Sequence, residues 1–295
     1  MSSSARADGA GRRFLQVAEL LRDRIKDGTY PADSLLPPQR ELAAGLGVSR
    51  DTIQRVLRQL SDEGLLDIRQ GSGSRVRGGP PGAPPETAAH VEAGRPALGA
   101  WIDRAFQEEA EVSLDVFSLT SETLVGHLTR QAERIIVEQK TPPRALRVRM
   151  LLPAEDEPLA YPRAQDPDDP RIHERWRMMA RRYVRETREL VARLGDAGVD
   201  TDLQVRRVRL TPTFKLYVLN GKHMLYGMYK PERTVITLDD EEETQVEAVD
   251  VLGAFSKLHS FHASGDERDA AFFEEKRDWF QSTWDVLGST ARREK

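Results

Sequence analysis

Polar and basic side chains recur along one side of a predicted helix that begins near Ser49. Arginine and glutamine can form paired hydrogen bonds with the edges of guanine and adenine in the major groove. Hydroxyl groups and the free backbone amides at the start of a helix suit phosphate oxygens. The residues that carry this pattern are Ser49, Arg50, Thr52, Gln54, Arg55 and Arg58. The pattern predicts a surface that binds double-stranded DNA, and the alternative is a solvated basic helix face.

The elements that must position this surface are predicted from the flanking sequence. Apolar residues at helical spacing predict one helix over 14–25 and another over 38–46. Gly47 suits the left-handed end of the second helix, and Ser49 suits the N-cap of the third. The third helix would bury a stripe made of Ile53, Val56, Leu57 and Leu60. The stretch "LLDIRQGSGSRVRG" predicts two short strands around a glycine-rich tip, followed by Arg75.

Composition limits the classes of protein to which the chain can belong. It has 295 residues, of which 39% are hydrophobic and 31% charged, as in ordinary globular proteins. The absence of cysteine excludes disulfides and cysteine-ligated metals. No run of about 18 apolar residues is present, so no membrane span is expected. Because the first residues also lack the apolar centre of a signal peptide, we expect a cytoplasmic, nucleoid-associated protein.

Charge and composition divide the chain into parts. Residues 1–79 contain 13 Lys+Arg and 10 Asp+Glu, which gives 13 − 10 = +3, and the remainder carries 31 − 38 = −7. A stretch rich in Pro, Gly and Ala separates the two parts and cannot form a core. We therefore predict a DNA-binding domain over 10–78, a linker over 79–97, and an effector-binding or dimerisation domain over 98–290.

Alternation of strand-like and helix-like segments predicts an α/β body in which helices cover a sheet. The expected strands are 112–120, 145–153, 203–212, 214–229 and 233–240, and the expected helices are 121–139 and 172–195. A helical region over 246–287 is expected to close the chain. Its aromatic residues have spacings that suit a core or a dimer interface.

The N-terminal part resembles the winged helix-turn-helix of the GntR family of bacterial transcription regulators. The similarity lies in "GTYPADSLLPPQRELA", "LGVSRDT" and "EGLLDIRQGSG", and it covers about 60 residues. It implies DNA contacts from Arg40 in the second helix, and from Gln70 and Gly71 in the wing. Many relatives carry arginine at the position of Gln54, which leaves the operator sequence open. The resemblance also implies a homodimer on a pseudo-palindromic operator.

The body weakly resembles a phospholipase D-like domain. That family's motif is His-x-Lys-x4-Asp, where this chain has Thr213, Lys215 and Asn220. Because Thr213 replaces the nucleophilic histidine, we expect no catalysis. The three residues could instead hold a small anionic or phosphorylated effector, or Lys215 could be a solvated strand residue.

The sequence thus predicts a transcription regulator that is not an enzyme and needs no cofactor or metal. A DNA-tethered phosphodiesterase and a body that binds only proteins remain as alternatives. His259, His262 and Asp266 have spacings that could begin a metal site, although a packed or solvated histidine pair is the favoured interpretation.

Overall fold

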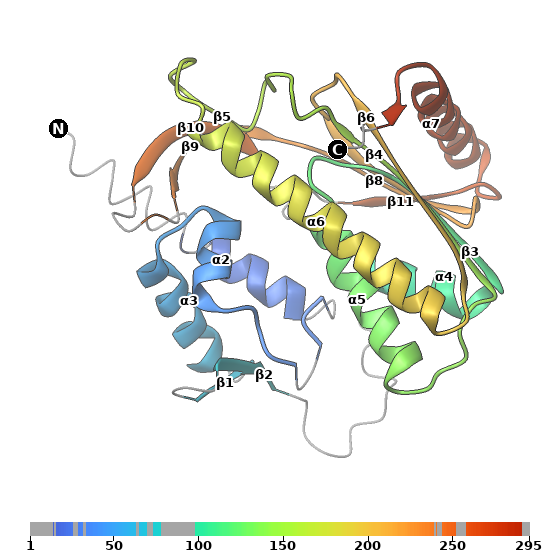
Figure 1. Cartoon of the computed structure of the whole chain (residues 1–295), viewed down its shortest axis with the longest axis horizontal. Coiled ribbons are helices and arrows are strands. Elements are labelled where there is room, and N and C mark those ends of the chain that lie inside the picture. The colour runs from blue at the N-terminus through green and yellow to red at the C-terminus, as the bar shows by residue number, and fades with distance from the viewer. Residues whose placement is uncertain are drawn as a thin grey trace. The chain divides into compact units, whose positions relative to one another are not determined.

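The computed structural model describes residues 14, 16–25, 29–31, 34–62, 65–69, 73–77, 98–238, 240, 244–251 and 258–290. The chain divides into two compact units (Figure 1). One contains residues 1–90 with Ala164–Ile172 and Arg233–Ala248, and the other contains the remaining residues. The predicted linker, residues 79–97, lies outside the described residues.

The N-terminal part of the first unit contains helices and a hairpin, as expected. Residues 16–25 are helical, and α2 (Gln39–Leu46) and α3 (Arg50–Asp62) follow. Strand β1 (Leu66–Arg69) pairs antiparallel with β2 (Gly73–Val76). The apolar residues of these elements form a small core of their own, in which Leu21, Leu42 and Leu66 are buried.

A seven-stranded mixed sheet forms the centre of the second unit. Its strand order is β11-β8-β7-β3-β4-β6-β12, and β3, β4 and β6 are mutually parallel. Its strands are β3 (Glu111–Phe117), β4 (Ala145–Pro153), β6 (Asp200–Val208), β7 (Phe214–Leu219), β8 (His223–Met228), β11 (His259–His262) and β12 (Ser289–Thr290). The other strands run antiparallel to their neighbours, so the sheet combines a βαβαβ centre with hairpin-type edges.

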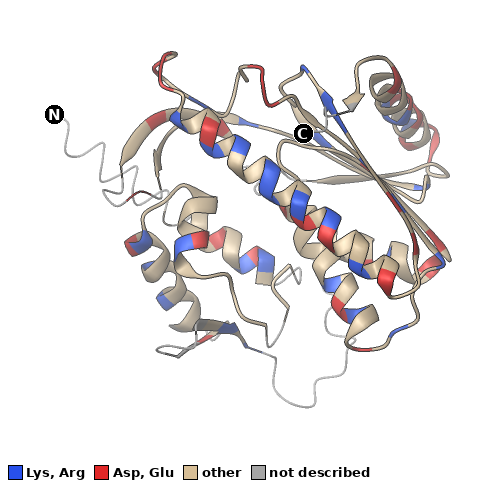
Figure 2. Ribbon diagram, viewed as in Figure 1, with Lys and Arg blue, Asp and Glu red and all other residues tan. Residues whose placement is uncertain are grey.

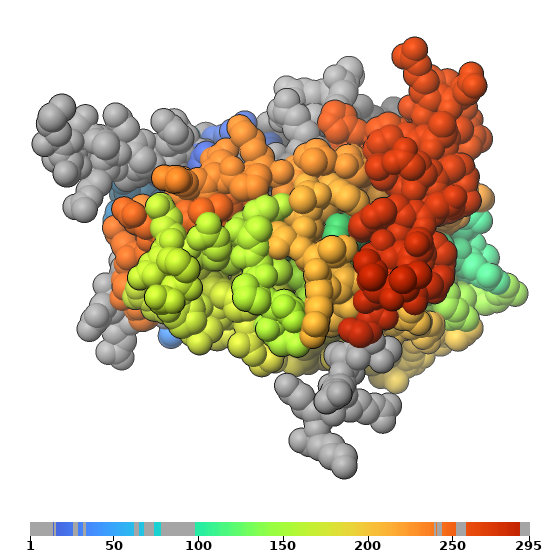
Figure 3. Space-filling model, turned by 90° about the horizontal axis from the view of Figure 1, so that it is seen from above, coloured from blue at the N-terminus to red at the C-terminus, as the bar shows by residue number. Residues whose placement is uncertain are grey.

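Helices cover both faces of this sheet (Figure 1). The helices are α4 (Leu98–Glu108), α5 (Glu122–Ile136), α6 (Arg171–Asp196) and α7 (Glu267–Val286). Because strand side chains alternate, Val112, Leu114 and Val116 of β3 pack with α4, α5 and α6, whereas Phe117 packs under α7. Helix α7 lies at the surface of the body, dark red in Figure 3. The expected sheet covered by helices is confirmed.

The expected helical region over 246–287 is wrong in its first half. Strand β10 (Gln245–Val251) occupies its beginning and forms a separate three-stranded sheet with β5 (Arg163–Ala164) and β9 (Pro231–Thr237). Strand β11 follows, and among the described residues of this region only α7 is helical. The residues "QVEA" at the start of β10 alternate polar and apolar side chains, a period of two that favours a strand. The aromatic residues of α7 do belong to the core, since Phe273, Phe280 and Trp284 are buried.

The hairpin between β7 and β8 depends on Asn220. This residue has φ 52°, in the left-handed region, and Gly221 after it has φ 62°. Its Oδ1 accepts a hydrogen bond from Ser113 N at 2.9 Å, and its Nδ2 donates one to Ala105 O at 3.2 Å. Asn220 therefore joins the hairpin to β3 and to α4.

Two substitutions separate the contributions of Asn220. Asn220→Gly keeps the backbone conformation but loses both side-chain hydrogen bonds, which should lower the free energy of unfolding by about 1–3 kcal/mol. Asn220→Ala should cost about 1–2 kcal/mol more, because alanine tolerates the left-handed region poorly. Urea unfolding followed by tryptophan fluorescence measures this, since all four tryptophans lie in the body. Equal stability of the glycine variant and the wild type would contradict the bonding role.

A histidine pair lies where β8 and β11 meet. His223 is paired in register with His262, and their Nδ1 atoms are 3.0 Å apart. The Trp101 ring of α4 packs against both imidazoles. Burial lowers the pKa of His223, and His262, Arg104 and Lys222 lower it further, whereas Glu108 opposes them. Within the described residues, no group of three or more His, Cys, Asp or Glu side chains is arranged to hold a metal ion.

This pair should make the stability of the body depend on pH. The unfolded chain takes up a proton near the ordinary histidine pKa of 6.5, whereas folded His223 does so only at lower pH. The stability that neutral His223 contributes is thus present above that value and is lost as the pH falls. His223→Gln should flatten the decline of the urea midpoint between about pH 7.5 and pH 5. Parallel curves for the variant and the wild type would show that His223 does not cause the decline.

Candidate nucleic-acid interface

The turn between α2 and α3 is closed by Gly47 and Ser49. Gly47 has φ 62° and ψ 40°, and its N–H bonds Ala43 O at the end of α2. A residue with a Cβ would be strained there. Ser49 Oγ accepts a hydrogen bond from Thr52 N at 3.1 Å, which is the bond of an N-cap. The helix end and the helix start predicted at this turn are both confirmed.

Burial of one side of α3 determines which side faces outward. Ile53, Val56 and Leu60 are 0% exposed and Leu57 is 1% exposed. Arg50, Gln54 and Arg58 lie at four-residue spacing on the opposite side, and all three are exposed. A helix of this length spans roughly 20 Å, enough to follow a major groove over several base pairs. The exposed face of α3 therefore has the side chains and the shape of a DNA-reading surface.

Some of the predicted DNA-contact residues already interact with other side chains of the protein. Ser49 Oγ and Thr52 Oγ1 lie 3.0 Å apart, so both hydroxyls take part in the cap. The guanidinium of Arg55 stacks 5.0 Å from the centre of the Phe14 ring. Phe14 thereby holds Arg55 against the N-terminal helical segment, a positioning role that sequence spacing did not indicate. Arg40 is exposed on α2.

The wing provides one further described contact residue. Arg75 is exposed on β2, opposite Asp67 of β1. The other two predicted wing residues, Gln70 and Gly71, lie outside the described residues. A basic side chain next to the tip of a hairpin can approach phosphates, and such contacts set the orientation of a protein on the duplex.

The structure does not bring Thr213, Lys215 and Asn220 together. Thr213 and Asn220 flank opposite ends of β7, roughly 23 Å apart at strand spacing. Asn220 uses its side chain in the hairpin turn. Lys215 is only 8% exposed, and its Nζ lies 5.5 Å from the centre of the Tyr229 ring, so it is not a solvated strand residue. A shared anion site made of these three residues is therefore excluded by their positions.

Buried polar residues surround the strand that carries Lys215. Burial raises the pKa of Tyr217 well above its ordinary value, and it does the same for Tyr229, whose hydroxyl accepts from Leu119 N at 2.9 Å. Arg175 of α6 is 8% exposed, and burial lowers its pKa against the opposing effects of Asp250 and Glu122. Among these groups, Lys215 and Tyr229 are in direct contact.

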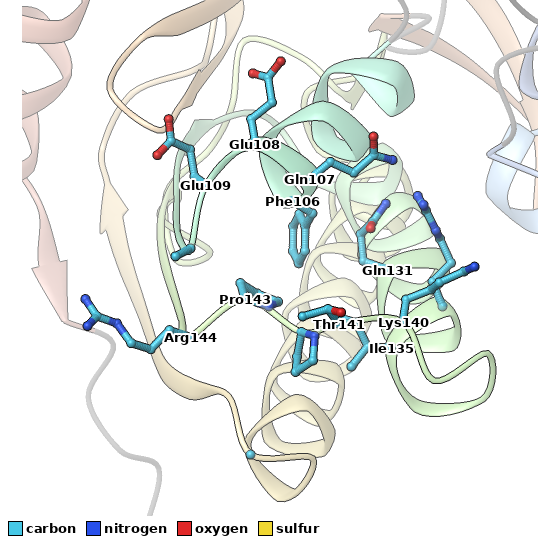
Figure 4. A pocket seen from close by; sticks show the side chains of 14 residues that line it. Phe106, Gln107, Glu108, Glu109, Gln131, Ile135, Lys140, Thr141, Pro143 and Arg144 are labelled. Carbon is cyan, nitrogen blue, oxygen red and sulfur yellow. The ribbon is translucent and has the colours of Figure 1, made fainter.

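A cavity of about 610 Å³ opens at another place in the body (Figure 4). The ring of Phe106 faces Thr141, Pro143 and Ile135 across it. Most charged residues on its rim have partners outside the cavity: Glu108 pairs with Arg104, Glu109 with Lys222, Arg144 with Glu111 and Arg134 with Asp103. The cavity has the volume of a small-molecule site. Because most charged residues on its rim already form ion pairs, few of them could bind a charged ligand.

Comparison with known proteins assigns the N-terminal segment. Residues 14–76 match the family described as bacterial regulatory proteins, gntR family. An HTH-type transcriptional regulator of Mycobacterium tuberculosis, itself uncharacterised, is 45% identical over 62 residues, 21% of this chain and 26% of that protein. The histidine utilization repressor of Pseudomonas aeruginosa is 38% identical over 63 residues, 21% and 25% of the two chains. This chain thus spans about a quarter of the length of these relatives.

A solved structure of the N-terminal domain of AraR in a complex is 36% identical, covers 22% of this chain and 91% of that one, and has a TM-score of 0.21. These comparisons give no support to the phospholipase D resemblance of the body. No helix within the described parts of the chain is long and apolar enough to cross a membrane. The matched segment coincides with the helices, turn and hairpin described above. Residues 14–76 are therefore similar to the gntR family of bacterial regulatory proteins, and the described helices, turn and hairpin within them have the arrangement of a winged helix-turn-helix.

Proposed function

We propose that the protein is a sequence-specific transcription regulator whose body adjusts DNA binding in response to a small effector. Sequence-specific DNA binding is supported mainly by the exposed face of α3. The buried apolar stripe on the other side of this helix determines the direction of that face. The family match covers the same elements. Arg40, Arg50, Gln54, Arg55 and Arg75 would contact the operator, together with the capped start of α3. Such a protein would act at the nucleoid.

A homodimer is part of this proposal. One winged helix-turn-helix contacts only a few base pairs, and two linked copies bind two half-sites far more tightly through effective concentration. Most apolar residues of the winged domain pack in its own core, and Leu35 is the exposed exception among its large described ones, so the second copy would be held through the body. Two-fold symmetry of the protein then requires a pseudo-palindromic operator.

The two alternative functions have less support. A phosphodiesterase would need a nucleophile near Lys215, but Thr213 lies exposed at the start of β7 and no base next to it in sequence could activate it. A body that binds only proteins would use exposed apolar side chains at the centre of the interface. Those of the body, such as Met178 on α6, Met228 on β8 and Val286 on α7, are equally available to the second copy of the homodimer, so they favour no other protein partner.

Substitution of Arg50 tests base recognition. Arg50→Ala should weaken operator binding by about 1–3 kcal/mol and relax the preference at one base pair, because a bidentate contact is lost. Arg50→Lys keeps the charge but not the fork, so it should retain affinity for random DNA and still lose discrimination. Selection of bound sequences from a random pool, followed by titration, measures both effects. If alanine lowers affinity for random and selected DNA equally, Arg50 contacts phosphate and the base-reading role is wrong.

Assembly is tested on the full chain. Sedimentation should give a dimer, and an operator with one half-site scrambled should bind about 100-fold more weakly than the intact site. Insertion of about 5 base pairs between the half-sites should weaken binding similarly, since it turns one half-site to the opposite side of the duplex. A monomer that binds single and paired half-sites alike would overturn the dimer.

A further inference from the structure

Arginines gather around a single carboxylate in the body, away from the cavity described above. Glu155 follows directly after β4, and its carboxylate pairs with Arg181 of α6 and Arg207 of β6. The same helix continues this basic side with Arg177, one turn before Arg181, and with Arg188, two turns after it. Figure 2 shows basic residues, in blue, along the length of α6.

The charges in this cluster do not balance. Four arginines and one glutamate give 4 − 1 = +3. Within the described residues, neither Arg177 nor Arg188 has a carboxylate within 4.0 Å, and the Nε of Arg177 is buried without a hydrogen-bond partner. Glu174, one turn before Arg177, makes no ion pair with it. By contrast, Arg182 and Arg185 on the outer side of α6 pair with Glu186 and Glu189.

Arg207 is the most confined member of the cluster, with a side chain 12% exposed. Burial lowers its pKa; Glu155 opposes that effect, and Arg188 and Arg181 add to it. A buried charge is stable only where opposite charge and hydrogen bonds compensate it. Glu155, itself shared with Arg181, supplies one negative charge for this purpose.

The cluster lies at the carboxyl ends of two parallel strands. Glu155 and Arg207 lie where the parallel strands β4 and β6 end, next to the pair Pro153 and Val208. In open α/β sheets, ligands bind beyond the carboxyl ends of the parallel strands. Arg177, Arg181 and Arg188 are interior residues of α6, the helix that connects β4 to β6 after the short strand β5.

We propose that Arg177, Arg181, Arg188 and Arg207 bind the phosphoryl group of a small phosphorylated effector. Guanidinium groups match phosphate oxygens through paired hydrogen bonds. The two arginines without a carboxylate within 4.0 Å among the described residues, Arg177 and Arg188, favour a phosphate dianion over a carboxylate with one charge. The cavity lined by Phe106 is a poorer anion site, because α4 and α5 end there and direct the negative ends of their dipoles towards it.

This site deepens the proposed function, since occupation of the cluster would change the operator affinity of the dimer. The binding of phosphate itself can be measured whether or not the chain binds an operator. The two proposals can therefore fail separately.

Calorimetric titration of the full chain with inorganic phosphate tests the site, at constant ionic strength maintained with chloride. The wild type should bind one phosphate per chain, and Arg188→Gln should weaken that binding about tenfold, since it removes a charge-assisted contact. The phosphate affinity of Arg188→Lys should lie between those of the wild type and Arg188→Gln. The matched control is Arg185→Gln, which removes the same charge from the same helix but from a side chain that pairs with Glu189. It should change the phosphate affinity less than about twofold.

Several results would overturn the site. One is the absence of heat from phosphate binding at phosphate concentrations up to tens of millimolar. Another is an equal loss of phosphate affinity in Arg188→Gln and Arg185→Gln, which would indicate nonspecific electrostatic attraction. The phosphates that the cluster binds could also be those of the DNA backbone. Titration with DNA in the absence of phosphate distinguishes that case from a free effector. Arg188→Gln should bind the selected operator as tightly as the wild type. A loss as large as that of Arg50→Ala would mean that the cluster contacts the DNA backbone, which would refute an effector site.

Discussion

Burial of the apolar stripe of α3 is the constraint on which the DNA-binding surface depends. With Ile53, Val56 and Leu60 fully buried, the helix cannot rotate about its axis without exposing apolar surface to water. The exposed positions, and with them Arg50 and Gln54, are consequently fixed in direction. The turn at Gly47 and the cap at Ser49 then determine where the helix starts. The direction of the side chains proposed to read DNA thus rests on the packing of residues that would not touch DNA.

The body obeys a related constraint at a larger scale. A sheet with parallel strands at its centre must be covered on both faces, and this chain uses α4, α5 and α6 on one face and α7 on the other. Consecutive residues of β3 accordingly belong to different cores, as Val116 and Phe117 do. The carboxyl ends of the parallel strands are left outside these cores, so polar residues can gather there without disturbing the packing.

Pairing of charges distinguishes the parts of the surface. Most arginines of the body have a nearby carboxylate, for example Arg149 with Asp115 and Arg147 with Asp200. Such exposed pairs contribute little to stability and mainly cancel each other's field. The cluster around Glu155 departs from this rule, because Arg177 and Arg188 have no carboxylate within 4.0 Å in the part of the chain that the structure describes. Positive charges without a nearby carboxylate attract an anion. The planar guanidinium group favours anions with two oxygens that can accept paired hydrogen bonds, such as phosphate.

The sequence by itself determined the features that depend on neighbours along the chain. Helical periodicity located α3 and its buried stripe, Gly47 and Ser49 located the turn, and "ALRVRMLLP" coincided with β4. Each depends on backbone preference or on a regular alternation of apolar residues, which is local information. The start of the region over 246–287 is hard to distinguish from a helix by sequence, because its alternation of polar and apolar residues is short and is followed by the long helix α7.

Only the tertiary structure decided what distant residues do together. Lys215 is buried against Tyr229, and Asn220 joins three elements, although a short motif had grouped both with Thr213. Arg207 and Arg181 share Glu155 although the three residues lie 26 to 52 positions apart from one another. Phe14 holds Arg55 across a similar gap in the chain. Strand pairing and helix packing bring these residues together. Neither can be predicted from the spacing of residue types along a single sequence.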